Sequence, residues 1–360
     1  MDRKLASVQK IIDIQSIKDA DKIEVATVLG WQVVVAKKDN FKIGDNAVYI
    51  EIDSIVPEKP EFEFLRDRKF RVRTIKLRGQ ISQGLLLPMS ILPKANYKEG
   101  QDVTEILGIK KYDTQAEIEQ RLLDEKIARE NSKIKKFLMK MKWYRRIFPK
   151  KKHGFPSFIK ITDEDRIQLF PDICTKESET PFIVTEKIDG QSATYFLIKH
   201  KGIFKSKYTF GVCSRKVFLP KKDNSSYWTI AIRHNIEGVL KSIIGNNNYV
   251  VLQGEIIGNR IQGNKYGVNG YDFYAFNLIY PDKKVDSIVA KEILSEHNIK
   301  FVPIIEENFL LKSTIPEMVD FSNSKSMIAN TLREGIVLRN YEKNISFKVV
   351  SPEFLLKYGE

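Results

Sequence analysis

The chain has 360 residues, of which 42% are hydrophobic and 29% charged, an ordinary balance for a globular protein with room for two domains. Its 60 Lys and Arg against 46 Asp and Glu give a formal net charge of +14, which favours a polyanion such as RNA or DNA as partner. No apolar run approaches the roughly 20 residues of a membrane-spanning helix, and the first residues do not lead into a secretory signal, so we expect no membrane partner.

The cysteines and histidines exclude two further classes of protein. Cys174 and Cys213 are too few for a disulfide framework and form no Cys-x-x-Cys pair. The four histidines are scattered, so the sequence offers no structural zinc site. We therefore expect an intracellular, reducing compartment, cytoplasm or nucleus. We also expect a monomer, although no sequence feature specifies the oligomeric state.

Residues 1–108 contain short apolar segments separated by turns. Strands are expected at residues 25–29, 31–36, 47–53, 70–75 and 85–88. Several short strands with glycine and Asp-Asn turns and little helix are typical of a small antiparallel barrel. We predict an all-β, OB-like barrel.

A basic run in this region suggests a binding face. Arg71, Arg73, Lys76 and Arg78 alternate with apolar residues, which would place several cations on one face of a strand. Such a face could follow a nucleic-acid backbone. The solvated face of any half-buried strand would carry the same pattern, so both interpretations stay open.

Residues 109–154 differ from both flanking regions. Glycine is absent from residues 111–152, and apolar residues recur at helical spacing, which predicts a long helix or a pair of helices. The second half of the segment is strongly basic. It could be a solvated connector between domains or an arm that tracks RNA.

From residue 155 onward, strand-like segments recur with helical stretches at residues 227–244 and 287–296 between them. This alternation predicts an α+β domain with antiparallel sheets. The strands at residues 249–257, 271–279, 333–338 and 345–350 each interrupt an apolar pattern with a polar group, and three of these groups are Glu255, Glu334 and Lys348. A charge in such a strand either faces solvent or lines a cleft.

Lys187 lies in a Lys-x-Asp-Gly pattern that could handle phosphate. It follows an apolar strand candidate, residues 182–184, and precedes the turn pair Asp189 and Gly190. The strand would hold the lysine rigidly, and the glycine would let a ligand approach the backbone. A bare pattern of this kind is more often a solvated turn lysine beside its counter-ion.

Further motifs follow in a fixed order. They are Ser214-Arg215-Lys216, Gly254-Glu255, Phe276, Glu334-Gly335 and Lys348. The series resembles the nucleotidyltransferase motifs of the covalent ligase and capping-enzyme superfamily, in which the lysine of Lys-x-Asp-Gly is adenylylated or guanylylated. The resemblance implies an ATP-grasp-like ligase fold for the C-terminal domain and makes Lys187 its nucleophile.

The resemblance also implies ligands for a divalent cation. A free lysine has a pKa near 10.4, so making its neutral amine at neutral pH costs roughly 4 kcal/mol. A nearby cation disfavours the ammonium form and polarises the α-phosphate of ATP. Asp189, Glu255 and Glu334 are implied to hold this Mg²⁺ or Mn²⁺ directly or through water.

The remaining motif residues are implied to bind the nucleotide. Lys348, together with Glu334, would contact the ATP site, and Lys348 would neutralise charge on the α-phosphate. Phe276 is implied to stack on adenine and Glu186 to contact the base edge. Arg215 is implied to bind the ribose or the RNA 5′-phosphate, which suits its bidentate fork.

The N-terminal region indicates the branch of the superfamily. Segments at residues 4–7, 29–31, 61–65, 76–84 and 157–168 resemble the ATP-dependent RNA ligases that carry an OB domain before the catalytic domain, the fifth RNA ligase family. The resemblance implies an OB-fold RNA-binding domain at 1–108, a basic helical linker at 109–154 and an adenylyltransferase domain at 155–360. It further implies sealing of 3′-OH and 5′-phosphate RNA ends, as in nicked duplexes, through lysyl-AMP and RNA-adenylate in RNA repair.

The sequence departs from the family pattern at two positions. Gln191 stands where serine is common, and Val350 stands in place of a second lysine, for which Lys357 could substitute. A DNA ligase or a capping guanylyltransferase remains an alternative enzyme.

A catalytically silent RNA-binding protein is an alternative of another class. The joint presence of Lys187, Glu255, Glu334 and Lys348 speaks against it, because binding a polyanion needs no carboxylates in the cleft.

Overall fold

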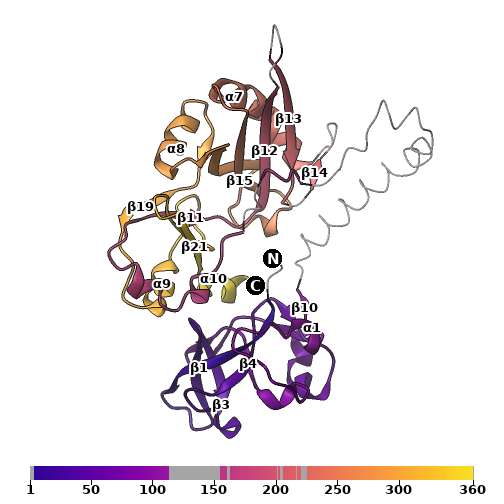
Figure 1. Ribbon diagram of the computed structural model, residues 1–360, viewed down its shortest axis with the longest axis vertical. Helices are drawn as coiled ribbons and strands as arrows, with labels where there is room; N and C mark the ends of the chain where they lie inside the picture. Colours follow the sequence, from indigo (N-terminus) through magenta and orange to yellow (C-terminus); the bar gives the residue numbers. More distant parts are fainter. Residues whose placement is uncertain are drawn as a thin grey trace, which may run out of the picture.

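The computed structural model describes residues 4–112, 155–159, 163–200, 202, 206–215, 217–219 and 225–359. Figure 1 shows an N-terminal domain in indigo and purple and a C-terminal domain in magenta to yellow, with the last helix, α10, lying between them. Residues 113–154 of the predicted helical linker lie outside the described residues. Within the part of the chain that is described, no helix is long and apolar enough to cross a membrane.

The N-terminal domain is the predicted antiparallel β-structure. Its main sheet has the order β3-β2-β1-β4-β9 and is joined by two small sheets, β10-β5-β6 and β7-β8. The elements are β1 (Ala6–Ser16), β2 (Ile23–Val28), β3 (Trp31–Ala36), η1 (Lys37–Asp39), β4 (Asn46–Ile50), β5 (Ser54–Ile55), η2 (Pro60–Arg68), β6 (Arg71–Val72), β7 (Ile75–Leu77), β8 (Gln80–Ser82), β9 (Leu85–Pro88), η3 (Met89–Ile91), α1 (Thr104–Leu107) and β10 (Lys110–Lys111).

Strand β1, which was not among the predicted strands, gives this sheet its curl. Its first half pairs with β4 and its second half with β2, and the register shifts between Ile11 and Asp13. A bulge of this kind bends a strand and increases its twist. One long strand can therefore serve both sides of the barrel.

The C-terminal domain contains two sheets, six α-helices and two 3-10 helices among its described residues. The elements are η4 (Ile167–Leu169), α5 (Ile173–Lys176), β11 (Phe182–Lys187), β12 (Gln191–His200), β13 (Lys207–Cys213), β14 (Phe218–Leu219), α6 (Ser226–Arg233), α7 (Ile236–Ile243), β15 (Tyr249–Gly258), η5 (Gln262–Asn264), β16 (Tyr271–Tyr280), β17 (Lys283–Lys284), α8 (Ser287–Ser295), β18 (Lys300–Phe301), β19 (Ile304–Phe309), α9 (Ile315–Ser322), β20 (Gly335–Asn340), β21 (Ile345–Val350) and α10 (Pro352–Tyr358).

The sheets of this domain have the orders β19-β11-β20-β21 and β14-β13-β12-β15-β16-β17, with β18 beside β16. The predicted antiparallel pairing holds except for β16 and β18, which run parallel. The predicted helix at residues 227–244 is two helices, because Asn235 has a φ of 45° and so interrupts the right-handed helix. Chain reversals between β11 and β12, and between α9 and β20, bring polar residues to one place where the two sheets meet.

Direct contacts join the two domains. The N–H of Gly30 donates to the carbonyl of Gln168 over 2.8 Å, and Arg166 lies 3.6 Å from Asp53. A Cβ at Gly30 would lie only 2.8 Å from the Cα of Gln168, so the turn between β2 and β3 packs closely against the C-terminal domain. Ile52 adds an apolar contact, in one cluster with Val350, Phe354 and Leu355.

Candidate active site

Lys187 and Glu334 form an ion pair at the end of β11. Lys187 is the last residue of this strand and lies opposite Gly335, the first residue of β20. Its Nζ is 2.5 Å from Oε2 of Glu334, and their side chains are 25% and 13% exposed. Gly335 has room for no side chain, since a Cβ there would lie 2.2 Å from the carbonyl oxygen of Val349. The close pairing of β20 with β21 fixes the start of β20. Glu334, the residue before this strand, therefore lies beside the lysine.

Glu255 approaches the same place from the other sheet. It lies on β15, opposite Ser192 of β12 and Tyr274 of β16. Gly190 packs against this strand, because a Cβ there would lie 2.3 Å from the carbonyl oxygen of Ile256 and 3.0 Å from Cγ of Glu255. The glycine of the Lys-x-Asp-Gly pattern therefore lets the turn after β11 lie close to Glu255.

The charges around Lys187 influence one another. Burial raises the pKa of Glu255 to about 8; Lys187 opposes this rise, and the carboxylates of Glu334 and Asp189 add to it. Burial acts to lower the pKa of Lys187, but Glu334, Glu255 and Asp189 outweigh it and the pKa ends above its ordinary value. Three carboxylates therefore surround the lysine and favour its ammonium form.

Asp189 is held by two neighbouring residues of one loop. Its Oδ2 lies 2.5 Å from Nζ of Lys265, and its backbone N–H donates to the hydroxyl of Tyr266 over 2.8 Å. Neither residue was predicted from the sequence as part of the site. They lie between Gly263 and Gly267 in a segment that has the composition of an ordinary turn, so no sequence signal could have identified them.

The three carboxylates suit a hard divalent cation. Among the described residues, no group of three or more His, Cys, Asp or Glu is arranged to coordinate a metal ion directly. Asp189, Glu255 and Glu334 nevertheless offer only oxygen donors, and they lie close enough to interact, since Glu334 and Asp189 both add to the rise in the pKa of Glu255 that burial causes. A cation that keeps its waters and touches the carboxylates through them fits this donor set.

Lys348 and Arg215 share the carboxylate of Asp163. Nζ of Lys348 is 3.4 Å from Oδ1, and a guanidinium nitrogen of Arg215 is 2.6 Å from Oδ2. Burial lowers the pKa of Lys348 to about 8, helped by the positive charges of Lys187 and Arg166. Asp163 was not identified from the sequence, although it lies in the segment at residues 157–168 that resembles the RNA ligases.

Glu186 is committed to a loop in this structure. Its carboxylate accepts hydrogen bonds from Oγ of Ser326 over 2.5 Å and from the backbone N–H of Met327 over 2.8 Å. Burial raises the pKa of Glu186, while these two hydrogen bonds act in the opposite direction. Both carboxylate oxygens thus position the loop, in addition to any contact with a base.

Phe276 occupies a β-bulge. The register between β15 and β16 passes from the pair Gln253 and Asn277 to the pair Gly254 and Ala275, so Phe276 is the extra residue. It is half-buried, whereas Phe273 is in the core. A bulge re-aims a side chain, and Phe276 packs against the edge of the core cluster that contains Phe273 while it stays partly exposed.

Arg71 does not lie in a free row of cations. It contacts Asp53 at 3.1 Å, donates to the carbonyl of Gly359 over 3.0 Å and stacks 3.7 Å from the ring centre of Tyr112. Its side chain is only 12% exposed. Arg71 therefore ties the N-terminal domain to the end of α10.

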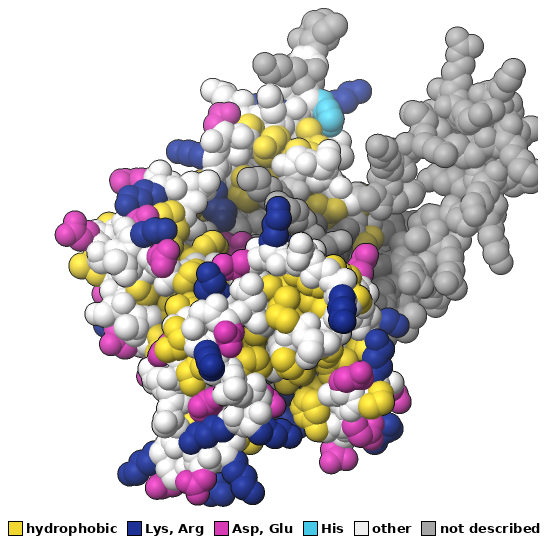
Figure 2. Space-filling model, turned by 60° about the horizontal axis from the view of Figure 1, so that its bottom comes forward, with side chains coloured by type: hydrophobic (Ala, Val, Ile, Leu, Met, Phe, Trp, Pro, Cys, Tyr) yellow, Lys and Arg dark blue, Asp and Glu magenta, His cyan; other side chains and the backbone are white. Residues whose placement is uncertain are grey.

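The expected single strand for the basic run is instead divided. β6 and β7 belong to different sheets, so Arg71 is separated from its neighbours. The exposed residues are Arg73, Lys76 and Arg78. Figure 2 shows one face of this domain, on which the coloured basic and acidic side chains are interspersed among hydrophobic ones. At the lower edge of this view several Lys and Arg side chains lie together, with Asp and Glu among them.

The two departures from the family pattern have structural partners. Gln191 accepts a hydrogen bond from Oγ of Ser226 over 3.0 Å, which links β12 to α6. Val350 is buried in the cluster with Ile52 at the domain interface. Lys357 is exposed on α10, 5.2 Å from the ring centre of Tyr358.

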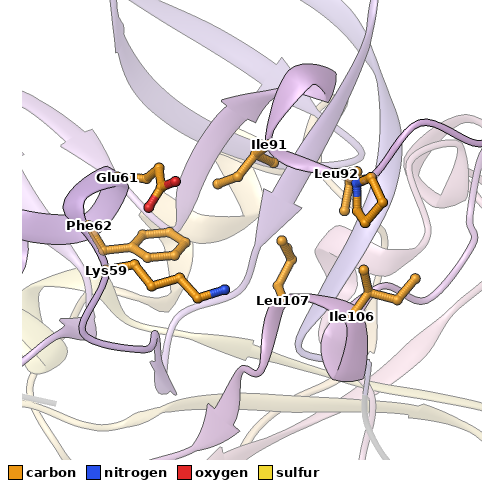
Figure 3. A pocket seen from close by; sticks show the side chains of 8 residues that line it. Lys59, Glu61, Phe62, Ile91, Leu92, Ile106 and Leu107 are labelled. Atoms are coloured by element: carbon orange, nitrogen blue, oxygen red, sulfur yellow. The ribbon is translucent and has the colours of Figure 1, made fainter.

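A hollow of about 300 Å³ lies away from these residues, in the N-terminal domain. Figure 3 shows the side chains that surround it, Lys59, Glu61, Phe62, Ile91, Leu92, Ile106 and Leu107. It shares no residue with the group around Lys187.

Comparison with known proteins identifies both domains. Residues 5–89 match the model of an OB-fold domain, and residues 180–358 match the model of the RNA ligase family. No curated protein matches the sequence. The match at residues 5–89 confirms the predicted OB fold, and the match at residues 180–358 places the nucleotidyltransferase motifs in an RNA ligase domain.

Solved structures extend the match over the whole chain. An RNA ligase of Naegleria gruberi with pyrophosphate is 31% identical, with a TM-score of 0.79 and coverage of 99% of each chain. A variant of that ligase with ATP and Mn has a TM-score of 0.78, covering 98% of this chain and 99% of that one. Another variant with AMP and Mn also has a TM-score of 0.78 and covers 99% of each. The chain belongs to the RNA ligase family.

Proposed function

We propose that this protein is an ATP-dependent RNA ligase that seals 3′-OH and 5′-phosphate ends, as in nicked duplexes, and serves RNA repair. The observation that carries the proposal is the position of Lys187, at the end of a rigid strand, among three carboxylates and near Lys348. The Naegleria structures with ATP and Mn, AMP and Mn, and pyrophosphate support this chemistry.

Lys187 must lose a proton before it can attack the α-phosphorus of ATP. In this structure its ammonium is paired with Glu334, and the surrounding carboxylates raise its pKa. A divalent cation bound at Asp189, Glu255 and Glu334 would supply positive charge that cancels this preference and polarises the phosphate. The ammonium of Lys187 would leave Glu334 and give its proton to solvent. Its neutral amine would then attack the α-phosphorus, form a phosphoramidate bond to AMP and break the bond to pyrophosphate, which leaves.

Lys348 and Arg215 are suited to the phosphates. Lys348 would stabilise charge that develops on the α-phosphate as pyrophosphate leaves. Arg215 would bind the ribose or the RNA 5′-phosphate, exchanging its contact with Asp163 for the new one. The 5′-phosphate then takes AMP from Lys187, and a 3′-OH attacks this RNA-adenylate and releases AMP.

Phe276 and Glu186 would bind the adenine. The half-buried phenyl at the bulge can stack on the base. Glu186 would contact the base edge beside the loop that it already positions.

A sealing assay tests the proposal directly. The protein is incubated with ATP, Mg²⁺ or Mn²⁺ and nicked duplexes that carry RNA or DNA on each side of the nick. We expect sealing when the strands at the nick are RNA, with an RNA-adenylate intermediate. Separate incubation with each α-labelled nucleotide provides the second readout, because a GMP adduct would indicate a capping enzyme, and sealing of DNA alone would indicate a DNA ligase.

We propose that Arg73, Lys76 and Arg78 contact the RNA backbone. Each phosphate contact contributes about 0.9 to the slope of log affinity against log salt. Replacing all three with alanine should weaken nicked-duplex binding and reduce the slope by up to about 3. Replacing the exposed Lys241, Lys283 and Lys291 removes the same charge from the other domain and should change the slope less. Equal slopes for the two triple variants would contradict this role.

A further inference from the structure

The loop that follows η5 presents two adjacent side chains to Asp189. Asn264 stabilises the loop, because its side chain donates to the carbonyl of Val268 over 3.0 Å and accepts from the N–H of the same residue over 3.0 Å. Gly263 has a φ of 68° and Gly267 a φ of 64°, conformations that favour glycine. The chain therefore reverses tightly on both sides of Lys265.

Lys265 and Tyr266 hold Asp189 from two directions. Nζ of Lys265 is 2.5 Å from Oδ2, and both side chains are 9% exposed. The hydroxyl of Tyr266 accepts the backbone N–H of Asp189 over 2.8 Å. One contact restricts rotation of the carboxylate and the other fixes the backbone of the turn. A buried charge pair with this geometry is much less screened than a surface pair.

Lys265 is itself held by helix α10. Its Nζ lies 4.7 Å from the ring centre of Phe354 and 4.8 Å from that of Tyr358, within the range of cation–π attraction. Phe354 also packs with Ile52 of the N-terminal domain. A continuous set of contacts thus runs from the domain interface through Lys265 to the turn that follows Lys187.

We propose that Lys265 is a positioning residue that holds the Asp189 carboxylate where it supports the divalent cation beside Lys187. This inference rests on the proposed adenylylation. It concerns a residue that lies outside the nucleotidyltransferase motifs. The opposite role is physically possible, because the ammonium of Lys265 and a cation could compete for the same carboxylate. The two roles predict opposite effects of removing the charge.

The test compares Lys265→Met and Lys265→Gln with Lys265→Arg in the full chain. The first readout is the Mn²⁺ concentration that gives half-maximal lysyl-AMP formation. The second is Mn²⁺ binding in the presence of α,β-methylene ATP, measured from the paramagnetic resonance signal of free Mn²⁺. We expect the uncharged variants to need about 10- to 100-fold more Mn²⁺ in both, the usual effect of removing a residue that orients a metal ligand. Lys265→Arg should restore part of the loss.

Lys300→Met is the matched control. Lys300 pairs with Asp272 at 2.7 Å and lies 5.4 Å from the ring centre of Tyr274, so it combines the same two kinds of contact on a more exposed side chain that pairs with a different carboxylate. It should leave both Mn²⁺ readouts unchanged.

Each outcome decides the question. An unchanged or lower Mn²⁺ requirement in Lys265→Met, with normal thermal unfolding, would overturn the positioning role, and a lower one would indicate competition. If the methionine variant fails to fold, Lys265→Gln, which keeps a polar side chain, gives the same comparison. Failure of the proposed function would look different, because the wild-type protein itself would then form no lysyl-AMP.

Discussion

Lys187→Met should abolish the covalent AMP adduct, with a loss of at least about 10⁴-fold in the rate of adenylylation. Methionine keeps most of the apolar stem but has no nucleophilic nitrogen, so nothing at the end of β11 can attack the α-phosphorus. The measurement is transfer of label from α-labelled ATP to protein. The variant should still bind nicked duplex, because Lys187 lies at the end of β11 in the C-terminal domain and is not one of the exposed cations of the N-terminal domain.

Lys199→Met is the control for this substitution. Lys199 lies on β12, where its exposed Nζ donates to the carbonyl of Gly245 over 2.8 Å. It should label as the wild type does. If the Lys187→Met variant still acquires the label, Lys187 is not the nucleophile.

The sequence predicted the motif residues of the site because each has a local signal. Lys187, Asp189 and Gly190 form one short pattern, and Glu255, Glu334 and Lys348 each interrupt an apolar strand. The structure brings them together because the ends of β11 and β20 meet the middle of β15. This proximity depends on the order of the strands, which no single motif indicates. The resemblance to a ligase family implies it only because it implies the fold as a whole.

Other residues of the site carry no such signal. Lys265 is 76 positions from Asp189 in the chain, and Asp163 is 185 positions from Lys348. Their importance arises only from the fold. An isolated lysine in a Gly- and Asn-rich turn looks like a solvated residue until burial shows that its charge is paired.

Alternating basic and apolar residues do not by themselves show that a segment forms a single strand. The spacing of Arg71, Arg73, Lys76 and Arg78 predicts one strand, but residues 71–72 and 75–77 form separate strands in different sheets. Arg71 contacts Asp53 and the end of α10, so part of the positive charge serves the domain interface. Charge pattern alone could not distinguish an interface arginine from one that binds RNA.

Lys348→Met should reduce adenylylation by about 100-fold or more, the scale of removing one group that stabilises developing charge.

The same variant should unfold less readily than the wild type in the absence of metal and nucleotide. Burial lowers the pKa of Lys348 to about 8 from the 10.5 of a free lysine, so the native state holds this charge at a cost. Each pKa unit corresponds to about 1.4 kcal/mol, which gives a gain of up to about 3 kcal/mol at pH 7.

The stability difference between Lys348→Met and the wild type should depend on pH. Between pH 8 and 10.5 the unfolded chain keeps the Lys348 proton and the native protein has lost it, so wild-type stability rises with pH in this window. The variant lacks this titration, and its advantage should therefore shrink from pH 8 upward. Urea unfolding at pH 7, 8, 9 and 10 measures the difference, with Lys199→Met as the control. A variant less stable than the wild type at pH 7, or an advantage that grows with pH, would show that the native protein stabilises the charge of Lys348, as a surface lysine paired with Asp163 would require.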